Sequence, residues 1–290
     1  MNVSIENDHL KISVNEKGAE MNGVFSKSTG LEYMWSGDPA FWGKTSPILF
    51  PIVGALKKET FNYKNKYYRL SRHGFARDST FQIVEQQDDK VIFLLSSTPA
   101  SREKYPFEFE LRVGYQLMQD NLEVSYSVKN SGNDVMYFSI GGHPAFKIPL
   151  VKGTAYEDHY LQFEKAEDAA RWPISEDGLI REEAVSFLKN SSILKLTRSL
   201  FNEDALVFKD LNSQKVSIKS FTHSHGLDFS FKGFPYLGIW AAKNADFVCI
   251  EPWCGIADSV LHDQQLVSKE GMIKISRGES WMRTWNIRMY

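Results

Sequence analysis

Three short segments of the chain place ionisable side chains among glycines, prolines and aromatic residues. They are Arg72–Arg77 (RHGFAR), Gly141–Phe146 (GGHPAF) and Cys249–Gly255 (CIEPWCG). We expect such segments at the ends of strands, where a rigid scaffold presents side chains for chemistry. A histidine and a carboxylate that lie close together can act as general acid and general base. The segments therefore supply His73, His143 and Glu251 as candidates for acid–base catalysis.

Each of these residues also has a structural explanation. A histidine beside a glycine is more often a turn or hydrogen-bonding residue than a catalytic one, which applies to His73 and His143 taken singly. Glu251 is expected to end the apolar strand 247–250, and it could instead be half of a buried ion pair. His223 and His225 form an H-x-H motif, but no nearby carboxylate or cysteine completes a metal site.

Alternation of apolar and polar residues is the dominant pattern along the chain, and it predicts β-strands. The clearest run covers residues 107–117, where Phe, Leu, Val and Tyr occupy every second position. A polar turn at 119–121 and a second alternating run over 122–128 complete an antiparallel hairpin. The same pattern predicts a hairpin of 81–84 with 91–95 and another of 227–231 with 234–240.

Helical periodicity is weak. The candidate helix is 182–189, where Ala184, Phe187 and Leu188 could share one face, and an irregular loop is the alternative. No linker rich in Pro, Gly or Ser, no internal repeat and no nucleotide-binding glycine motif interrupts the strand pattern. We therefore predict an all-β fold, a large antiparallel β-sandwich that forms a single domain over residues 1–290.

The composition narrows the class of partner. Lys and Arg total 34 against 36 Asp and Glu, a net charge of −2, which offers no basic surface for nucleic acid. Aromatic residues reach 13%, which suits a β core and also supplies flat faces on which sugar rings stack. No apolar run approaches the roughly 18 residues of a membrane-spanning helix, and residues 1–10 do not resemble a signal peptide. We expect a cytoplasmic protein without membrane contact.

The two cysteines, Cys249 and Cys254, are separated by four residues. A single C-x4-C pair is typical neither of a zinc knuckle nor of a disulfide framework. Both cysteines are therefore predicted to be buried free thiols.

The order and spacing of these motifs resemble the aldose 1-epimerase superfamily, also called galactose mutarotases, and within it the LacX-like branch. The resemblance covers nearly the whole chain. It rests on the segments Gly18–Met21, Leu49–Gly54 (LFPIVG), His73–Arg77 (HGFAR), Gly142–Pro144, Glu251–Trp253 and Asp258–Ser259. It implies a twisted antiparallel β supersandwich with a sugar-binding cleft on one sheet.

The resemblance also implies roles for individual residues. His143 matches the general acid of the family and Glu251 its general base, while His73 matches a second histidine that orients the sugar near its ring oxygen. Asp204 lies where the family commonly places an aspartate that binds sugar hydroxyls, and a turn residue before a strand is the alternative explanation. The implied activity is exchange between the α and β anomers of an aldose, so the expected partner is a small sugar or sugar phosphate.

Acid–base chemistry fits this activity. One group takes the proton of the C1 hydroxyl while another protonates the ring oxygen, so that the ring opens to an aldehyde, rotates and closes again. We expect Glu251 to act as a carboxylate and His143 as an imidazolium. No metal or organic cofactor is required.

One position departs from the family pattern. Relatives commonly carry an arginine soon after the Leu49–Gly54 segment, whereas this chain has Ala55, followed by Leu56, Lys57 and Lys58. Lys57 and Arg77 are candidate replacements, and this cationic group predicts a preference for phosphorylated hexoses. A solvated surface is the alternative explanation of adjacent lysines, and a pocket for another sugar or impaired catalysis would also account for Ala55.

Two other functions fit the same residues. A carbohydrate-binding sandwich without catalysis would use the same aromatic and polar side chains. A metal-dependent hydrolase would use His73, His143 and Glu251 as ligands, although these residues lack compact ligand spacing. The sequence decides neither which sugar is bound nor whether two copies pair as a homodimer.

Overall fold

The computed structural model of the chain describes residues 1–290, which fold into antiparallel β-sheets with one short α-helix. This confirms the predicted all-β class. The helix, α1 (Pro99–Lys104), begins at Thr98, whose side chain accepts a hydrogen bond from the backbone N–H of Ser101. The segment 182–189 forms no helix: its only regular element is the two-residue strand β17, and Val185 is exposed. None of the helices has the length and apolarity needed to span a bilayer.

The largest sheet has nine strands. In spatial order they are β18 (Ser191–Lys195), β15 (His159–Glu167), β20 (Lys215–Ser220), β21 (Leu227–Ser230), β25 (Ser280–Met289), β11 (Asn121–Asn130), β10 (Phe109–Met118), β9 (Lys90–Ser96) and β8 (Gln82–Gln86). The hairpin β10–β11 pairs without interruption from Phe109↔Asn130 to Met118↔Asn121, and β8–β9 forms a second hairpin. Both were predicted from alternation, and both are confirmed.

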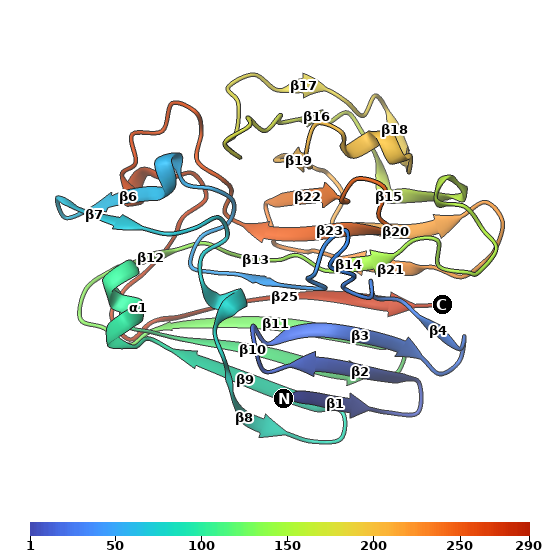
Figure 1. Cartoon of the computed structure of the whole chain (residues 1–290), viewed down its shortest axis with the longest axis horizontal. Helices are drawn as coiled ribbons and strands as arrows, with labels where there is room; N and C mark the ends of the chain where they lie inside the picture. The colour runs from blue at the N-terminus through green and yellow to red at the C-terminus, as the bar shows by residue number, and fades with distance from the viewer.

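A six-stranded sheet lies against the large one. Its path is β19 (Leu206–Phe208), β22 (Tyr236–Trp240), β23 (Phe247–Cys254), β13 (Ile140–Gly142) and β5 (Ile48–Leu49), and β14 (Ala145–Lys147) also pairs with β23. Figure 1 shows β22 and β23 above β25 and β11. Between the two layers, the rings of Phe146 and Phe229 pack with centroids 5.9 Å apart.

Smaller sheets complete the molecule. They are β1 (Asn2–Glu6), β2 (Leu10–Asn15), β3 (Glu20–Ser26) and β4 (Leu31–Glu32) in one sheet, and the pairs β6 (Thr60–Tyr63) with β7 (Lys66–Arg69), β12 (Met136–Phe138) with β24 (Ile273–Ile275), and β16 (Ala170–Arg171) with β17 (Val185–Ser186).

The third predicted hairpin is wrong. Strand β21 pairs with β20 and β25 in the large sheet, whereas β22 pairs with β19 and β23 in the six-stranded sheet. Phe231 and Phe234 on either side of the turn are both buried. The turn at Lys232 and Gly233 therefore carries the chain from one layer to the other, and the burial of both rings stabilises this crossing by removing their apolar surface from water.

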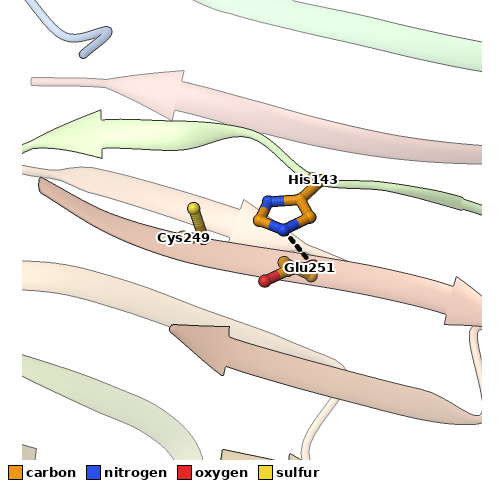
Figure 2. A group of neighbouring side chains, drawn as sticks. All are labelled: His143, Cys249 and Glu251. Carbon is orange, nitrogen blue, oxygen red and sulfur yellow. Dashed lines mark ion pairs between the residues drawn. The ribbon is translucent and has the colours of Figure 1, made fainter. Parts of the chain in front are cut away.

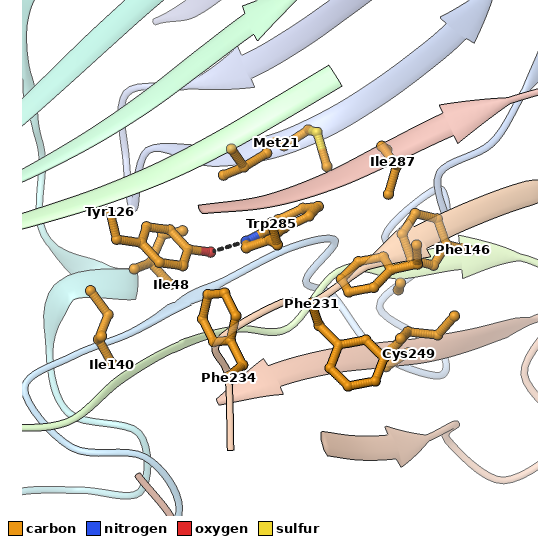
Figure 3. Close-up of a cluster of buried hydrophobic side chains, with 14 of the residues drawn as sticks. Met21, Ile48, Tyr126, Ile140, Phe146, Phe231, Phe234, Cys249, Trp285 and Ile287 are labelled. Carbon is orange, nitrogen blue, oxygen red and sulfur yellow. Dashed lines mark hydrogen bonds between the residues drawn. The ribbon is translucent and has the colours of Figure 1, made fainter. Parts of the chain in front are cut away.

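The core between the layers fixes the backbone that leads to His143. Trp285 of β25 donates a hydrogen bond from Nε1 to the hydroxyl of Tyr126 on β11, at 2.9 Å, and Figure 3 shows both rings facing Ile140 and Phe146 of the other layer. A Cβ added at Gly142 would lie 2.7 Å from the Tyr126 hydroxyl. Only glycine allows β13 to approach the core this closely. His143 is the next residue, so its backbone is held in place by the packing of β13 against the core.

Candidate active site

A cavity of about 320 Å³ opens on the face of the six-stranded sheet that points away from the large sheet. Its walls include His73, His143 and Glu251, the three candidates for acid–base chemistry. The structure therefore brings together side chains from three separate segments of the sequence. We refer to this cavity as the cleft.

Strand β23 forms the floor of the cleft. Phe247, Cys249, Glu251 and Trp253 occupy alternate positions, so their side chains share one face of the strand. The sequence predicted that Glu251 ends an apolar strand after Ile250. The strand instead continues to Cys254 because every residue from 247 to 254 is buried and paired, which places Glu251 in mid-strand.

His143 lies between β13 and β14, and both of these strands pair with β23. Gly141 pairs with Trp253, and Ala145 pairs with Cys249. His143 lies midway between Gly141 and Ala145, and Glu251 lies midway between their two partners, so His143 is directly across from Glu251. The imidazole and the carboxyl group are therefore a cross-strand pair, whose side chains lie close together on one face of the sheet.

The two side chains meet at the floor of the cleft. Figure 2 shows His143 Nε2 pointing at the carboxyl group of Glu251, and the distance from Nε2 to Oε2 is 3.2 Å. The exposed fractions are 8% for His143 and 1% for Glu251. Apart from this contact, Glu251 Oε2 has no polar partner, and His143 Nδ1 has none at all, although both atoms are buried. Unsatisfied buried polar groups are rare in folded proteins, and this pair is therefore a candidate for function.

Burial sets the protonation of the pair. It lowers the pKa of His143 to about 3, and it raises the pKa of Glu251 well above its usual range. The positive charge of Arg72 opposes the shift at Glu251 and adds to the shift at His143. We expected an imidazolium and a carboxylate at rest, whereas these shifts favour a neutral imidazole and a protonated carboxyl group. Both arrangements hold one shared proton, and they differ only in which residue carries it.

A glycine on the neighbouring strand keeps the floor of the cleft open. Gly238 of β22 lies opposite Glu251. A Cβ at this position would fall 2.5 Å from the indole ring of Trp253. Without a side chain at 238, Trp253 lies beside Glu251 and contributes an aromatic surface to the cleft.

His73 is oriented by the backbone. Its Nδ1 accepts a hydrogen bond from the N–H of Gly54 at 3.1 Å, and its backbone has φ 69°. Burial lowers the pKa of His73 well below its usual value, so the ring is neutral. Because Nδ1 accepts, the proton of the neutral ring is on Nε2. His73 lines the cleft as a hydrogen-bond donor, with its ring 5.8 Å from that of His143.

Tryptophans form a second wall, which the sequence analysis did not identify. The ring centroids of Trp42 and His143 lie 4.9 Å apart, with an interplanar angle of 30°. The ring of Trp240 packs edge-on against that of His143, with centroids 5.6 Å apart. Both residues line the cleft. The general excess of aromatic residues was the available signal, but it did not distinguish these two from the core rings.

Charged residues lie at the rim. Asp204 lines the cleft, as the resemblance implied, and its Oδ2 lies 3.6 Å from Nη2 of Arg72. Arg77 also lines the cleft. Arg72 was missed as a site residue although it directly precedes His73, because sequence adjacency alone does not show which way an arginine points.

The structure places Lys57 outside the cleft. Its Nζ donates to the carbonyl of His262 at 3.1 Å, and it lines a neighbouring cavity together with Ala55, Lys58 and Arg72. Of Lys57, Lys58 and Arg72, only Arg72 lines both this cavity and the cleft. Ala55 faces Gly178, where an added Cβ would lie 3.3 Å from the Ala55 methyl group and 3.5 Å from the Arg72 guanidinium. The loop that carries Gly178, together with Arg72, therefore fills the space beside the small side chain at 55.

The histidines of the H-x-H motif lie elsewhere. His223 and His225 border a separate depression over β15, β20 and β21, with their rings 6.0 Å apart. His159 is the nearest other histidine to His223, but both of its ring nitrogens are engaged by backbone groups. These three residues are not a metal-binding group.

Comparison with known proteins matches this architecture to one family. The sequence model of the family described as aldose 1-epimerase matches residues 1–281. The chain belongs to the aldose 1-epimerase family. It is 31% identical to the chromosomal LacX protein of Lactococcus lactis subsp. lactis, over 99% of both chains. The predicted membership of the LacX-like branch is confirmed.

Solved structures of this family confirm the predicted fold. A galactose mutarotase related enzyme from Lactobacillus acidophilus superposes with a TM-score of 0.94 at 34% identity, over 100% of this chain and 97% of that one. A galactose mutarotase-like protein from Lactobacillus casei gives the same TM-score at 29% identity, with both chains fully covered. The chain therefore has the galactose mutarotase-like fold.

Proposed function

We propose that the protein is an aldose 1-epimerase that interconverts the α and β anomers of a hexose or hexose phosphate. The observation that carries the proposal is the cross-strand contact of His143 with Glu251 at the floor of the cleft, 3.2 Å between Nε2 and Oε2. Family membership supports an activity on sugars, and the contact between His143 and Glu251 supports their assignment as the acid and base that anomer exchange needs.

The single proton of the pair fits the reaction. Movement of that proton from Glu251 to His143 gives the carboxylate and the imidazolium, and the positive charge of Arg72 favours the carboxylate. Glu251 then takes the proton of the C1 hydroxyl while His143 protonates the ring oxygen. The bond between C1 and the ring oxygen breaks as the C1 carbonyl forms. After rotation about the C1–C2 bond the same steps run in reverse on the other face, and the pair regains its original protonation.

Other residues of the cleft would position the sugar. The Nε2–H of His73 is a donor for the ring-oxygen region, and Asp204 with Arg72 offers an acceptor and a donor at the rim. Trp42 and Trp240 present flat surfaces for the apolar face of a pyranose ring. The mechanism uses side chains alone.

The test is anomer exchange measured by polarimetry or NMR saturation transfer over a panel of hexoses and their 6-phosphates. We expect acceleration for at least one sugar in wild type and its loss in Glu251→Gln. Binding of a sugar without any acceleration would instead favour the carbohydrate-binding alternative.

A further inference from the structure

Cys249 lies beside the catalytic pair, and the proposed reaction does not use it. It is fully buried on β23, two residues before Glu251, so both side chains point to the same face of the strand. Its neighbour across the sheet is Ala145, two residues after His143. The thiol thus lies next to both proposed catalytic groups, as Figure 2 shows.

We propose that Cys249, His143 and Glu251 form an inhibitory binding site for a thiophilic divalent cation such as zinc or cadmium. The inhibitory role rests on the proposed function, whereas the binding itself does not. The sequence suggested a different donor set, with His73 in place of the cysteine. The structure brings the donor atoms of His143, Cys249 and Glu251 within 4.8 Å of one another, and His73 is not in this group.

The distances fit tetrahedral coordination. Bonds of about 2.0–2.1 Å to nitrogen and about 2.0–2.2 Å to oxygen separate the two ligand atoms by about 3.3–3.5 Å at a tetrahedral angle. The distance of 3.2 Å from His143 Nε2 to Glu251 Oε2 already matches this separation. A metal–sulfur bond of about 2.3 Å places the sulfur about 3.5 Å from the nitrogen, so from within 4.8 Å the sulfur needs to approach by at most about 1.3 Å.

The polar atoms also fit a cation. Glu251 Oε2 is buried and its only polar contact is His143 Nε2, so an ion that replaces the shared proton between these two atoms disturbs no other partner of Oε2. A thiolate and a carboxylate together neutralise a divalent ion, and a neutral imidazole completes three ligands of mixed N, S and O type, a set that zinc accepts. Binding displaces the thiol proton of Cys249 and the carboxyl proton of Glu251, and both protons leave to solvent.

The route to the site explains why the ion would inhibit. His143 and Glu251 line the cleft, whereas Cys249 lies behind them, so an ion enters through the space that the sugar occupies. Once bound, it holds the nitrogen and oxygen that exchange protons with the substrate. We therefore expect cadmium and zinc to slow anomer exchange and to compete with the sugar.

The two cysteines of the chain allow a matched experiment. Cys254 is also buried, but its side chain points to the other face of β23 and its Sγ lies 3.9 Å from the carbonyl oxygen of Gly233. Wild type, Cys249→Ser, Cys249→Ala and Cys254→Ser are titrated with cadmium chloride. Two signals are followed: the ultraviolet charge-transfer absorption of a cadmium–thiolate bond and the rate of anomer exchange. Thermal midpoints check that each variant is folded, and Cys249→Ala serves if serine is not tolerated.

The expected result is a cadmium–thiolate absorption in wild type and Cys254→Ser that is absent in both Cys249 variants. The cadmium concentration that halves the exchange rate should rise at least about 10-fold in the Cys249 variants, because losing a ligand costs no less than losing a hydrogen-bond partner of a ligand. Equal inhibition of all variants, or an absorption that depends on Cys254, would overturn the proposal. The absorption needs no catalysis, so a protein that binds cadmium through Cys249 but exchanges no sugar would refute the proposed function and leave the metal site standing.

Discussion

His143 and Glu251 face each other across adjacent strands, with Nε2 and Oε2 3.2 Å apart and both groups almost completely buried. The strands before and after His143, β13 and β14, both pair with β23, through Gly141↔Trp253 and Ala145↔Cys249. These pairings hold His143 opposite Glu251. A backbone held this firmly leaves the two side chains, the proposed acid and base, little freedom to move apart. The chemistry proposed for the protein depends on this pair.

Replacing His143 by Asn or Glu251 by Gln should lower the exchange rate by about 10²-fold or more, because each change removes a proton donor or acceptor. The thermal midpoint should change little in Glu251→Gln, since a neutral amide of the same shape replaces a carboxyl group that burial keeps neutral. Glu203→Gln is the control, because Glu203 is exposed and pairs with Arg171. Wild-type rates in both variants would show that the pair is structural.

The pH profile of activity should be a broad bell. Burial lowers the pKa of His143 to about 3 and raises that of Glu251, so the pair keeps one proton over a wide range. A second proton binds only in strong acid and removes the base, while alkaline pH takes the shared proton and removes the acid. The apparent pKa values of the two limbs belong to the coupled pair and not to either residue alone. A rate that climbs steadily through neutral pH, as a free histidine titrates, would contradict the shared-proton arrangement.

Chelation should leave the exchange rate undiminished. The proposed acid and base are side chains, so removing metal with EDTA takes away nothing that the reaction uses. The measurement compares the rate before and after dialysis against EDTA, followed by addition of zinc. Activity lost in EDTA and restored by zinc would favour the metal-dependent alternative.

Replacing Arg72 by Ala should lower kcat/KM for the best sugar by about 10-fold to 100-fold, the loss of one charge-assisted hydrogen bond. Arg72 is the cation beside Asp204, and its guanidinium lies in the space next to the small side chain of Ala55. The control is Arg69→Ala, since Arg69 pairs with Glu59 and lines neither cavity. Adding Ala55→Arg to Arg72→Ala should restore part of the loss, and equal kcat/KM in Arg72→Ala and wild type would show that Arg72 does not contact the sugar.

Phosphorylated hexoses should be preferred to neutral ones. Arg77 and Arg72 line the cleft, and Lys57 and Lys58 line the cavity next to it. A phosphate that reaches Arg72 or Arg77 gains contacts worth about 1.5–3 kcal/mol each, whereas Lys57 lies outside the cleft and already donates to the carbonyl of His262. The measurement is kcat/KM for a hexose and its 6-phosphate in wild type, Lys57→Ala, Lys58→Ala and Arg77→Ala. If the two sugars are used equally and no substitution changes their ratio, a neutral aldose is the substrate.

Strand content and hairpins could be predicted from the sequence where the pattern is local. The alternation over 107–128 predicted β10 and β11, because a period of two directly encodes which side chains face the core. The same reasoning failed at Lys232 and Gly233. The sequence of a short turn between two apolar runs is the same whether the chain reverses within one sheet or crosses to another sheet. The packing of Phe231 and Phe234 determines which of the two the chain does.

The sequence by itself determined the family and the identity of the proposed acid and base, since His143 and Glu251 lie in motifs whose order and spacing are readable without a structure. Only the tertiary structure decided their protonation and their neighbours. Burial depends on everything packed around a group, so the low pKa of His143 has no signature in its own segment. The same holds for Arg72, which reaches the cleft, and Lys57, which does not, because the direction of a long side chain is set by contacts with residues far away in the sequence.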